Sequence, residues 1–123
     1  MEERLTLAIL AGGISKRMGT DKALLPFRGQ ALIAHIAARG RGLTDDLLVA
    51  TNHLEAYRFL NLPLHPDRLP LGGALAGMHA ALSAAARPLV AVIACDMPFF
   101  SPDLLAHQAK LLAESGADAA IPL

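Results

Sequence analysis

Three short apolar runs limit what this chain can fold into more than any other feature of its sequence. They occupy residues 5–10, 46–51 and 89–95, and they are dominated by Leu, Ala, Val and Ile. Runs of this length without regular polar alternation are typical of strands that are buried on both faces of a parallel sheet. The sequence therefore predicts an α/β protein with such a sheet at its centre.

Helical segments separate these runs. We expect helices at residues 30–39, 53–60, 74–86 and 102–115, where apolar residues recur at helical spacing or Ala dominates. Ser101 can cap the last helix, Pro102 suits its first turn, and Gly116 ends it. A brief strand at 62–65, an irregular connection at 66–73 and a strand at 117–121 complete the pattern. This alternation predicts a doubly wound, mostly parallel sheet with helices on both faces.

Composition narrows the class of protein further. The chain has 123 residues, is 54% hydrophobic and carries no formal net charge, so we expect one domain over residues 1–123 with a substantial core. The lack of a long basic face argues against nucleic acid as a partner. The longest apolar run is far shorter than the roughly 20 residues that span a membrane, and no leader pattern precedes it. We therefore expect a cytoplasmic protein with no membrane partner and, with Cys95 alone, no intrachain disulfide.

Candidate functional residues follow the strands. In open parallel sheets, ligands bind beyond the carboxyl ends of the strands, where loops begin. Four places in this chain meet that condition: the loop at residues 10–22, Asn52 after the second strand, Asp67 after the third, and Asp96 after the fourth. We expect the fold to bring them to one edge of the sheet.

The loop after the first strand has the composition of an anion-binding turn. Ala11, Gly12 and Gly13 allow a close backbone approach to a ligand, and Arg17 and Lys22 add cations that suit a triphosphate. The sequence matches neither the dinucleotide pattern GxGxxG nor the Walker pattern GxxxxGK[ST]. By spacing alone, a glycine turn flanked by solvated cations explains it equally well.

The other candidates also have structural explanations. Asp96 follows an apolar strand and would suit Mg²⁺, although a turn or cap residue before Pro98 is the commoner role for such an Asp. Asn52 could form an Asx turn and Asp67 a Pro-Asp turn. The five His residues show no metal-ligand spacing, so we assign them ordinary surface or core roles.

A resemblance to a known family favours the functional interpretation. The segment LAGGISKRMGTDKALLPFRGQALIAH closely resembles the start of the molybdenum cofactor guanylyltransferases, the MobA family, which belongs to a larger group of nucleotidyltransferases with a loop close to LAGGxSxRMGxDK. The segment CDMP is similar to the family's CDxP, and LGGALAGM is similar to its GPLAGM, with Ala74 in place of the usual Pro. The matching loop residues are Leu10, Ala11, Gly12, Gly13, Ser15, Arg17, Met18, Gly19, Asp21 and Lys22.

The resemblance implies a fold, a reaction and a set of site residues. The fold is a three-layer, Rossmann-like, mostly parallel sheet of the nucleotidyltransferase (glycosyltransferase-A-like) type. The reaction is the Mg²⁺-dependent transfer of GMP from GTP to molybdopterin, which forms the guanine dinucleotide cofactor and pyrophosphate. The implied catalytic residues are Lys22, Arg17 and Asp96, with Asp96 as the Mg²⁺ ligand. The implied nucleotide-binding residues are Leu10, Ala11, Gly12, Gly13, Lys22, Asn52, Asp67 and Asp96.

The resemblance also leaves alternatives and a concern about length. A cytidylyl- or sugar-phosphate nucleotidyltransferase, or an inactive nucleotide-binding module, would fit the same motifs. Family domains continue past the position that corresponds to Leu123, so we expect the nucleotide-binding part to be present and the acceptor-binding part to be missing, with the fold incomplete at the C-terminus. For this chain we accordingly expect self-association and little transfer activity, with GTP, molybdopterin and other proteins of the cofactor pathway as partners.

Overall fold

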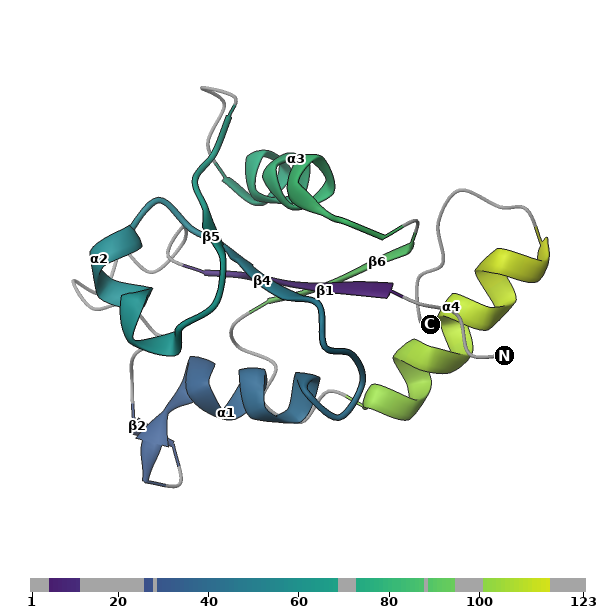
Figure 1. Cartoon of the computed structure of the whole chain (residues 1–123), viewed down its shortest axis with the longest axis horizontal. Helices are drawn as coiled ribbons and strands as arrows, with labels where there is room; N and C mark the ends of the chain where they lie inside the picture. Colours follow the sequence, from purple (N-terminus) through teal and green to yellow (C-terminus); the bar gives the residue numbers. More distant parts are fainter. Residues whose placement is uncertain are drawn as a thin grey trace.

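A four-stranded parallel sheet forms the centre of the computed structural model, which describes residues 5–11, 26–27, 29–68, 73–87, 89–94 and 101–115 (Figure 1). The strand order is β5-β4-β1-β6, so the chain moves outward from β1 to β4 and β5, and then places β6 on the other side of β1. This order confirms the predicted doubly wound α/β fold. The sheet strands are β1 (Leu5–Leu10), β4 (Leu47–Ala50), β5 (Leu64–His65) and β6 (Leu89–Ala94).

Helices cover both faces of the sheet. Helix α3 lies on one face, and α1 and α4 lie on the other (Figure 1). Because side chains alternate along a strand, Leu7 and Ile9 of β1 join the core under α1, whereas Ala8 packs with Ala81 of α3. The helical elements are α1 (Leu32–Gly40), α2 (Leu54–Tyr57), the 3₁₀ turn η3 (Arg58–Leu60), α3 (Gly73–Ala84) and α4 (Pro102–Ser115).

Several element boundaries differ from the sequence-based expectation. The helix expected from residue 30 begins at Leu32, because a turn at Gly29 with φ of 85° pairs β2 (Pro26–Phe27) with β3 (Gln30–Ala31) in a short hairpin. The helix expected at 53–60 changes to 3₁₀ geometry after Tyr57 and is followed by Asn61 in a left-handed conformation. The strand expected at 117–121 lies outside the described residues.

Helix α4 confirms its predicted bounds and its cap. It runs from Pro102 to Ser115, and the Leu104 N–H donates to Ser101 Oγ at 3.1 Å. This bond satisfies one of the backbone donors that the first turn of a helix leaves without an intrahelical partner.

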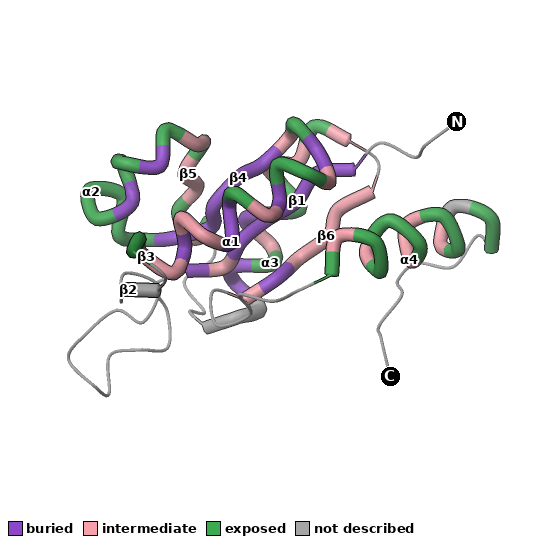
Figure 2. Tube along the Cα trace, turned by 90° about the horizontal axis from the view of Figure 1, so that it is seen from below, coloured by how far each residue is buried: buried purple, intermediate pink, exposed green. Residues whose placement is uncertain are grey.

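Strand β6 is less buried than expected. The apolar run predicted burial on both faces, but Ile93 alone among its residues is buried, and the other five are half-buried (Figure 2). In the described sheet β6 is the last strand beyond β1, so one of its two edges has no strand neighbour among the described residues. An apolar run therefore predicts that a strand forms here, but its position in the sheet decides how far it is covered.

Glycine and alanine allow the helices to approach the sheet closely. A Cβ on Gly40 would lie 2.5 Å from Leu7 Cδ2 and 2.9 Å from Leu47 Cδ2, so the end of α1 rests directly on two strands. A Cβ on Gly77 would lie 3.3 Å from Leu10 Cδ2, which brings α3 against the end of β1. Both helices are thus seated on the strands whose ends carry the candidate site.

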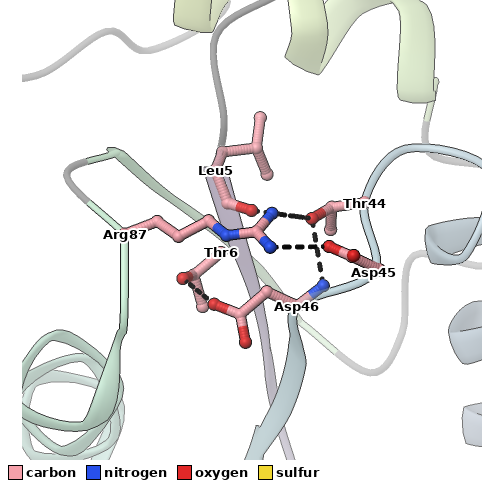
Figure 3. A network of polar contacts seen from close by, with 6 residues as sticks. All are labelled: Leu5, Thr6, Thr44, Asp45, Asp46 and Arg87. Atoms are coloured by element: carbon pink, nitrogen blue, oxygen red, sulfur yellow. Dashed lines mark hydrogen bonds and ion pairs between the residues drawn. The ribbon is translucent and has the colours of Figure 1, made fainter.

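A polar network ties the amino ends of the strands together (Figure 3). The Thr44 hydroxyl donates to the Leu5 carbonyl at 2.7 Å and accepts hydrogen bonds from the Asp46 N–H at 3.1 Å and from Arg87 Nη1 at 3.3 Å. Arg87 Nη2 also forms an ion pair with Asp45 at 2.7 Å. The network joins β1, the segment before β4 and the turn before β6, at the edge opposite the candidate site.

Candidate functional site

Two of the predicted site residues form a reciprocal pair at the carboxyl edge of the sheet. Asn52 follows β4 and Asp67 follows β5, fifteen positions later in the chain. Asn52 Nδ2 donates to Asp67 Oδ2 at 3.0 Å, and the Asp67 N–H donates to Asn52 Oδ1 at 2.8 Å. Each side chain thus keeps one polar group, the second carboxylate oxygen or the second amide hydrogen, without a bond to another described residue.

The start of the glycine loop lies at the same edge. Leu10 ends β1 in register with Ala50 of β4 and Ala94 of β6, and the Ala11 N–H donates to the Ala50 carbonyl at 3.0 Å. Asn52 follows Ala50 by two residues, so Leu10 and Ala11 lie one strand away from Asn52 and two strands away from Asp67. The predicted site residues Gly12, Gly13, Arg17, Lys22 and Asp96 lie outside the described residues.

Sequence reasoning missed Thr51, which holds the turn that carries Asn52. Its backbone N–H donates to the His65 carbonyl at 3.0 Å, and its hydroxyl accepts a hydrogen bond from the His53 N–H at 3.0 Å. Ser and Thr hydroxyls commonly bond to a backbone N–H two residues further along the chain in such turns. The signal in the sequence was a hydroxyl residue at the end of a predicted strand and directly before a candidate ligand residue.

A pocket lies between the β5 region and α3. It has a volume of about 380 Å³ and is lined by His65, Pro66 and Arg68 from the β5 region and by Ala80 and Ala84 of α3. The small side chains of α3 leave room beside β5, and the exposed Arg68 provides a cation at its rim.

The described residues do not by themselves form a metal centre. Within the described ranges, no three His, Cys, Asp or Glu side chains are grouped closely enough to hold a metal ion. The Asn52 amide oxygen accepts a hydrogen bond from the Asp67 N–H, and one Asp67 carboxylate oxygen accepts one from Asn52 Nδ2. These two oxygens therefore do not point together toward a common metal position. Within the same ranges, no helix has the length and apolar character needed to cross a membrane.

Comparison with known proteins identifies the family. Residues 7–123 match the family model described as the MobA-like NTP transferase domain. The chain belongs to this family. The match covers the glycine loop, the Asn52–Asp67 pair and the region around Asp96, and it confirms the resemblance inferred from the loop motif.

Two curated relatives align with almost the whole of this MobA-like chain. A protein of Carboxydothermus hydrogenoformans named probable molybdenum cofactor guanylyltransferase is 41% identical over 116 residues, which are 94% of this chain and 56% of the relative. A molybdenum cofactor guanylyltransferase of Cupriavidus necator is 39% identical over 122 residues, which are 97% of this chain and 61% of the relative. The chain therefore spans about three fifths of the length of these relatives.

Solved structures confirm the nucleotidyltransferase type of fold. The molybdopterin-guanine dinucleotide biosynthesis protein A of Archaeoglobus fulgidus superimposes with a TM-score of 0.76 at 27% identity, covering 96% of this chain and 60% of that one. CMP:2-keto-3-deoxy-manno-octonic acid synthetase, solved with CTP, superimposes with a TM-score of 0.74 over 94% of this chain and 49% of that one. Its identity is 15%, so it supports the fold alone.

Proposed function

We propose that this chain binds GTP at the carboxyl edge of its sheet, as the nucleotide-binding part of a molybdenum cofactor guanylyltransferase. The observation that carries the proposal is the Asn52–Asp67 pair, which joins two strand ends beside the start of the glycine loop. The names of the curated relatives point to a guanylyl group and the molybdenum cofactor, and the name of the Archaeoglobus fulgidus protein points to molybdopterin as the acceptor.

The reaction is a transfer of GMP. An oxygen of the terminal phosphate of molybdopterin forms a bond to the α-phosphorus of GTP while the bond from that phosphorus to the bridging oxygen breaks, and pyrophosphate leaves. The attacking phosphate is already ionised near neutral pH, so the protein does not need a side chain that removes a proton. The contribution of the protein is to position the reactants and to neutralise charge.

Each site residue has a role in this proposal. Backbone amides of Leu10, Ala11, Gly12 and Gly13, together with Arg17 and Lys22, hold the phosphates. Asn52 and Asp67 contact the base and ribose through the polar groups that their mutual bonds leave available. Asp96 would hold Mg²⁺, whose positive charge stabilises the phosphates as negative charge moves toward pyrophosphate.

Equilibrium titration of the purified chain with GTP, CTP and ATP in the presence of Mg²⁺ tests the nucleotide. We expect GTP to bind most tightly, and Asp67→Asn to weaken GTP binding, whereas Asp103→Asn on the exposed start of α4 leaves it unchanged. Equal affinity for all three nucleotides contradicts the guanylyl assignment, and tighter binding of CTP replaces it with a cytidylyl one.

Release of pyrophosphate from GTP and molybdopterin tests the transfer itself. Because the chain spans about three fifths of its relatives, we expect it to bind GTP and to show little or no turnover. Turnover comparable to that of a full-length relative would show that residues 1–123 contain the acceptor site as well.

A further inference from the structure

We propose that Thr51 is a positioning residue that holds Asn52 in its nucleotide-binding conformation, an inference that rests on the proposed function. Thr51 does not offer a group to the ligand itself, because it is only 2% exposed. Its two hydrogen bonds to other described residues are made to backbone, one to the end of β5 and one to the residue after Asn52.

These bonds surround Asn52. The bond from the Thr51 N–H to the His65 carbonyl, 3.0 Å long, keeps the end of β4 in register with the end of β5, two residues before Asp67. The bond from the His53 N–H to the Thr51 hydroxyl, also 3.0 Å long, closes a turn with Asn52 at its centre. The direction in which Asn52 leaves the backbone therefore depends on the Thr51 hydroxyl.

The paired geometry requires this direction to be well defined. Asn52 meets Asp67 through two bonds of 3.0 Å and 2.8 Å, one from each residue, and a rotation of the turn would break both. Asn52 itself is exposed, so packing does not hold its side chain in place. Among the described residues, the Thr51 hydroxyl and Asp67 are the groups that constrain the conformation of Asn52.

A purely structural role for the hydroxyl predicts a different result from a positioning role. His53 is exposed, so water can hydrogen-bond to its N–H when the Thr51 hydroxyl is removed. Val has nearly the same shape as Thr, so it fills the buried space that Thr51 occupies. Thr51→Val should thus change the melting temperature little. Its effect should appear instead in nucleotide affinity, because the turn that carries Asn52 loses a constraint.

The binding test compares Thr51→Val with Thr51→Ser, each in the wild-type chain and in an Asn52→Ala background. By calorimetric titration with GTP and Mg²⁺, we expect Thr51→Val to bind about fivefold more weakly, the factor set by one hydrogen bond, and Thr51→Ser to stay within about twofold of wild type. In the Asn52→Ala background, Thr51→Val should cause no further loss. Unchanged affinity of Thr51→Val, or the same loss in both backgrounds, overturns the inference.

Amide hydrogen exchange tests the positioning without a nucleotide. In Thr51→Val, the N–H groups of His53 and Asp67 should exchange faster, while that of Val49 inside β4 keeps its rate. If the wild-type chain binds no nucleotide, the proposed function fails, and the exchange result alone decides whether Thr51 positions Asn52. Unchanged exchange at Asp67 overturns the inference on that measurement.

Discussion

Asn52 and Asp67 show how two side chains that are distant along the chain become one paired unit. Each residue alone is a common turn former, and each has an exposed or half-buried position where a single hydrogen bond adds little to the stability of the fold. The reciprocal bonds at 3.0 Å and 2.8 Å make the orientation of each side chain depend on the other. Their proposed contribution at the residue scale is therefore to binding geometry more than to folding.

Coupling between the two residues is a direct prediction of this geometry. Asn52→Ala and Asp67→Ala should each weaken GTP binding by about 1–2 kcal/mol, because each removes a proposed contact with the nucleotide and releases its partner. The double variant should lose less than the sum of the two, since the pair acts as a unit. Calorimetric titration of all four proteins measures the coupling, and strictly additive losses would show that the two side chains act independently.

Lys22 tests the phosphate part of the proposal. Lys22→Ala should weaken GTP binding by about 1.5–3 kcal/mol, the value of a hydrogen bond to a charged group, without changing the melting temperature. Lys110→Ala on the exposed surface of α4 is the matched control and should bind like wild type. An affinity for GTP that Lys22→Ala leaves unchanged would place Lys22 among ordinary solvated lysines.

Asp96 tests the metal. Asp96→Asn preserves the shape of the side chain and removes its charge, so the Mg²⁺-dependent part of GTP affinity should fall. Binding measured with a chelator present should persist or improve, because a negative charge near the phosphates is gone. Parallel titrations with and without Mg²⁺ separate the two effects, and loss of both together would indicate a structural Asp.

At the scale of elements, the Thr44 hydroxyl forms hydrogen bonds with groups in three segments of the chain. Thr44→Val should lower the free energy of unfolding by about 1–3 kcal/mol, because the Leu5 carbonyl, the Asp46 N–H and Arg87 all lose a partner near buried strand ends. Thr44→Ser keeps the hydroxyl and should retain most of the stability. Asp45→Asn should cost less than about 1 kcal/mol, since that carboxylate is 85% exposed. Urea unfolding measures these free energies, and a larger loss of stability in Asp45→Asn than in Thr44→Val would contradict the central role of the Thr44 hydroxyl.

Gly40 sets how closely α1 packs on the sheet. Ala is favoured over Gly inside a helix, yet Gly40→Ala should destabilise the protein by about 1–3 kcal/mol, because the added Cβ would lie 2.5 Å from the fully buried Leu7. Gly42→Ala is the control, because Gly42 is exposed and, among the described residues, its Cβ would meet only the Arg39 carbonyl, at 3.4 Å. Thermal unfolding distinguishes them, and equal melting temperatures would show that Leu7 and Leu47 can yield.

At the scale of the whole molecule, apolar side chains remain on the outer surfaces of the helices. On α4, Leu104 is 45% exposed and Leu111 is 49% exposed, seven residues apart on one side of the helix, beside the half-buried β6. Exposed apolar surface of this kind promotes association. Sedimentation velocity should show concentration-dependent self-association that decreases in Leu104→Glu/Leu111→Glu. A monomer at every concentration would contradict the prediction.

The sequence by itself determined the main strands and helices and the sheet edge at which the candidate residues gather. The apolar runs around Ile9, Val49 and Ile93 predicted strands of a parallel sheet, because short runs of this composition are typical of strands that helices cover on both faces. Polar residues that end such runs must then meet at one edge, which is why the sequence pattern alone singles out Asn52 and Asp67. The cap at Ser101 was equally local, since a hydroxyl acts on its own next turn.

Only the tertiary structure decided relations between segments that are distant along the chain. The partnership of Asn52 with Asp67 and the supporting role of Thr51 depend on the register between β4 and β5, which no local pattern encodes. The partial exposure of β6 depends on its place in the strand order, and the contact of Gly40 with Leu7 depends on how α1 crosses the sheet. Local chemistry selects the element, whereas long-range packing selects the neighbours of each side chain.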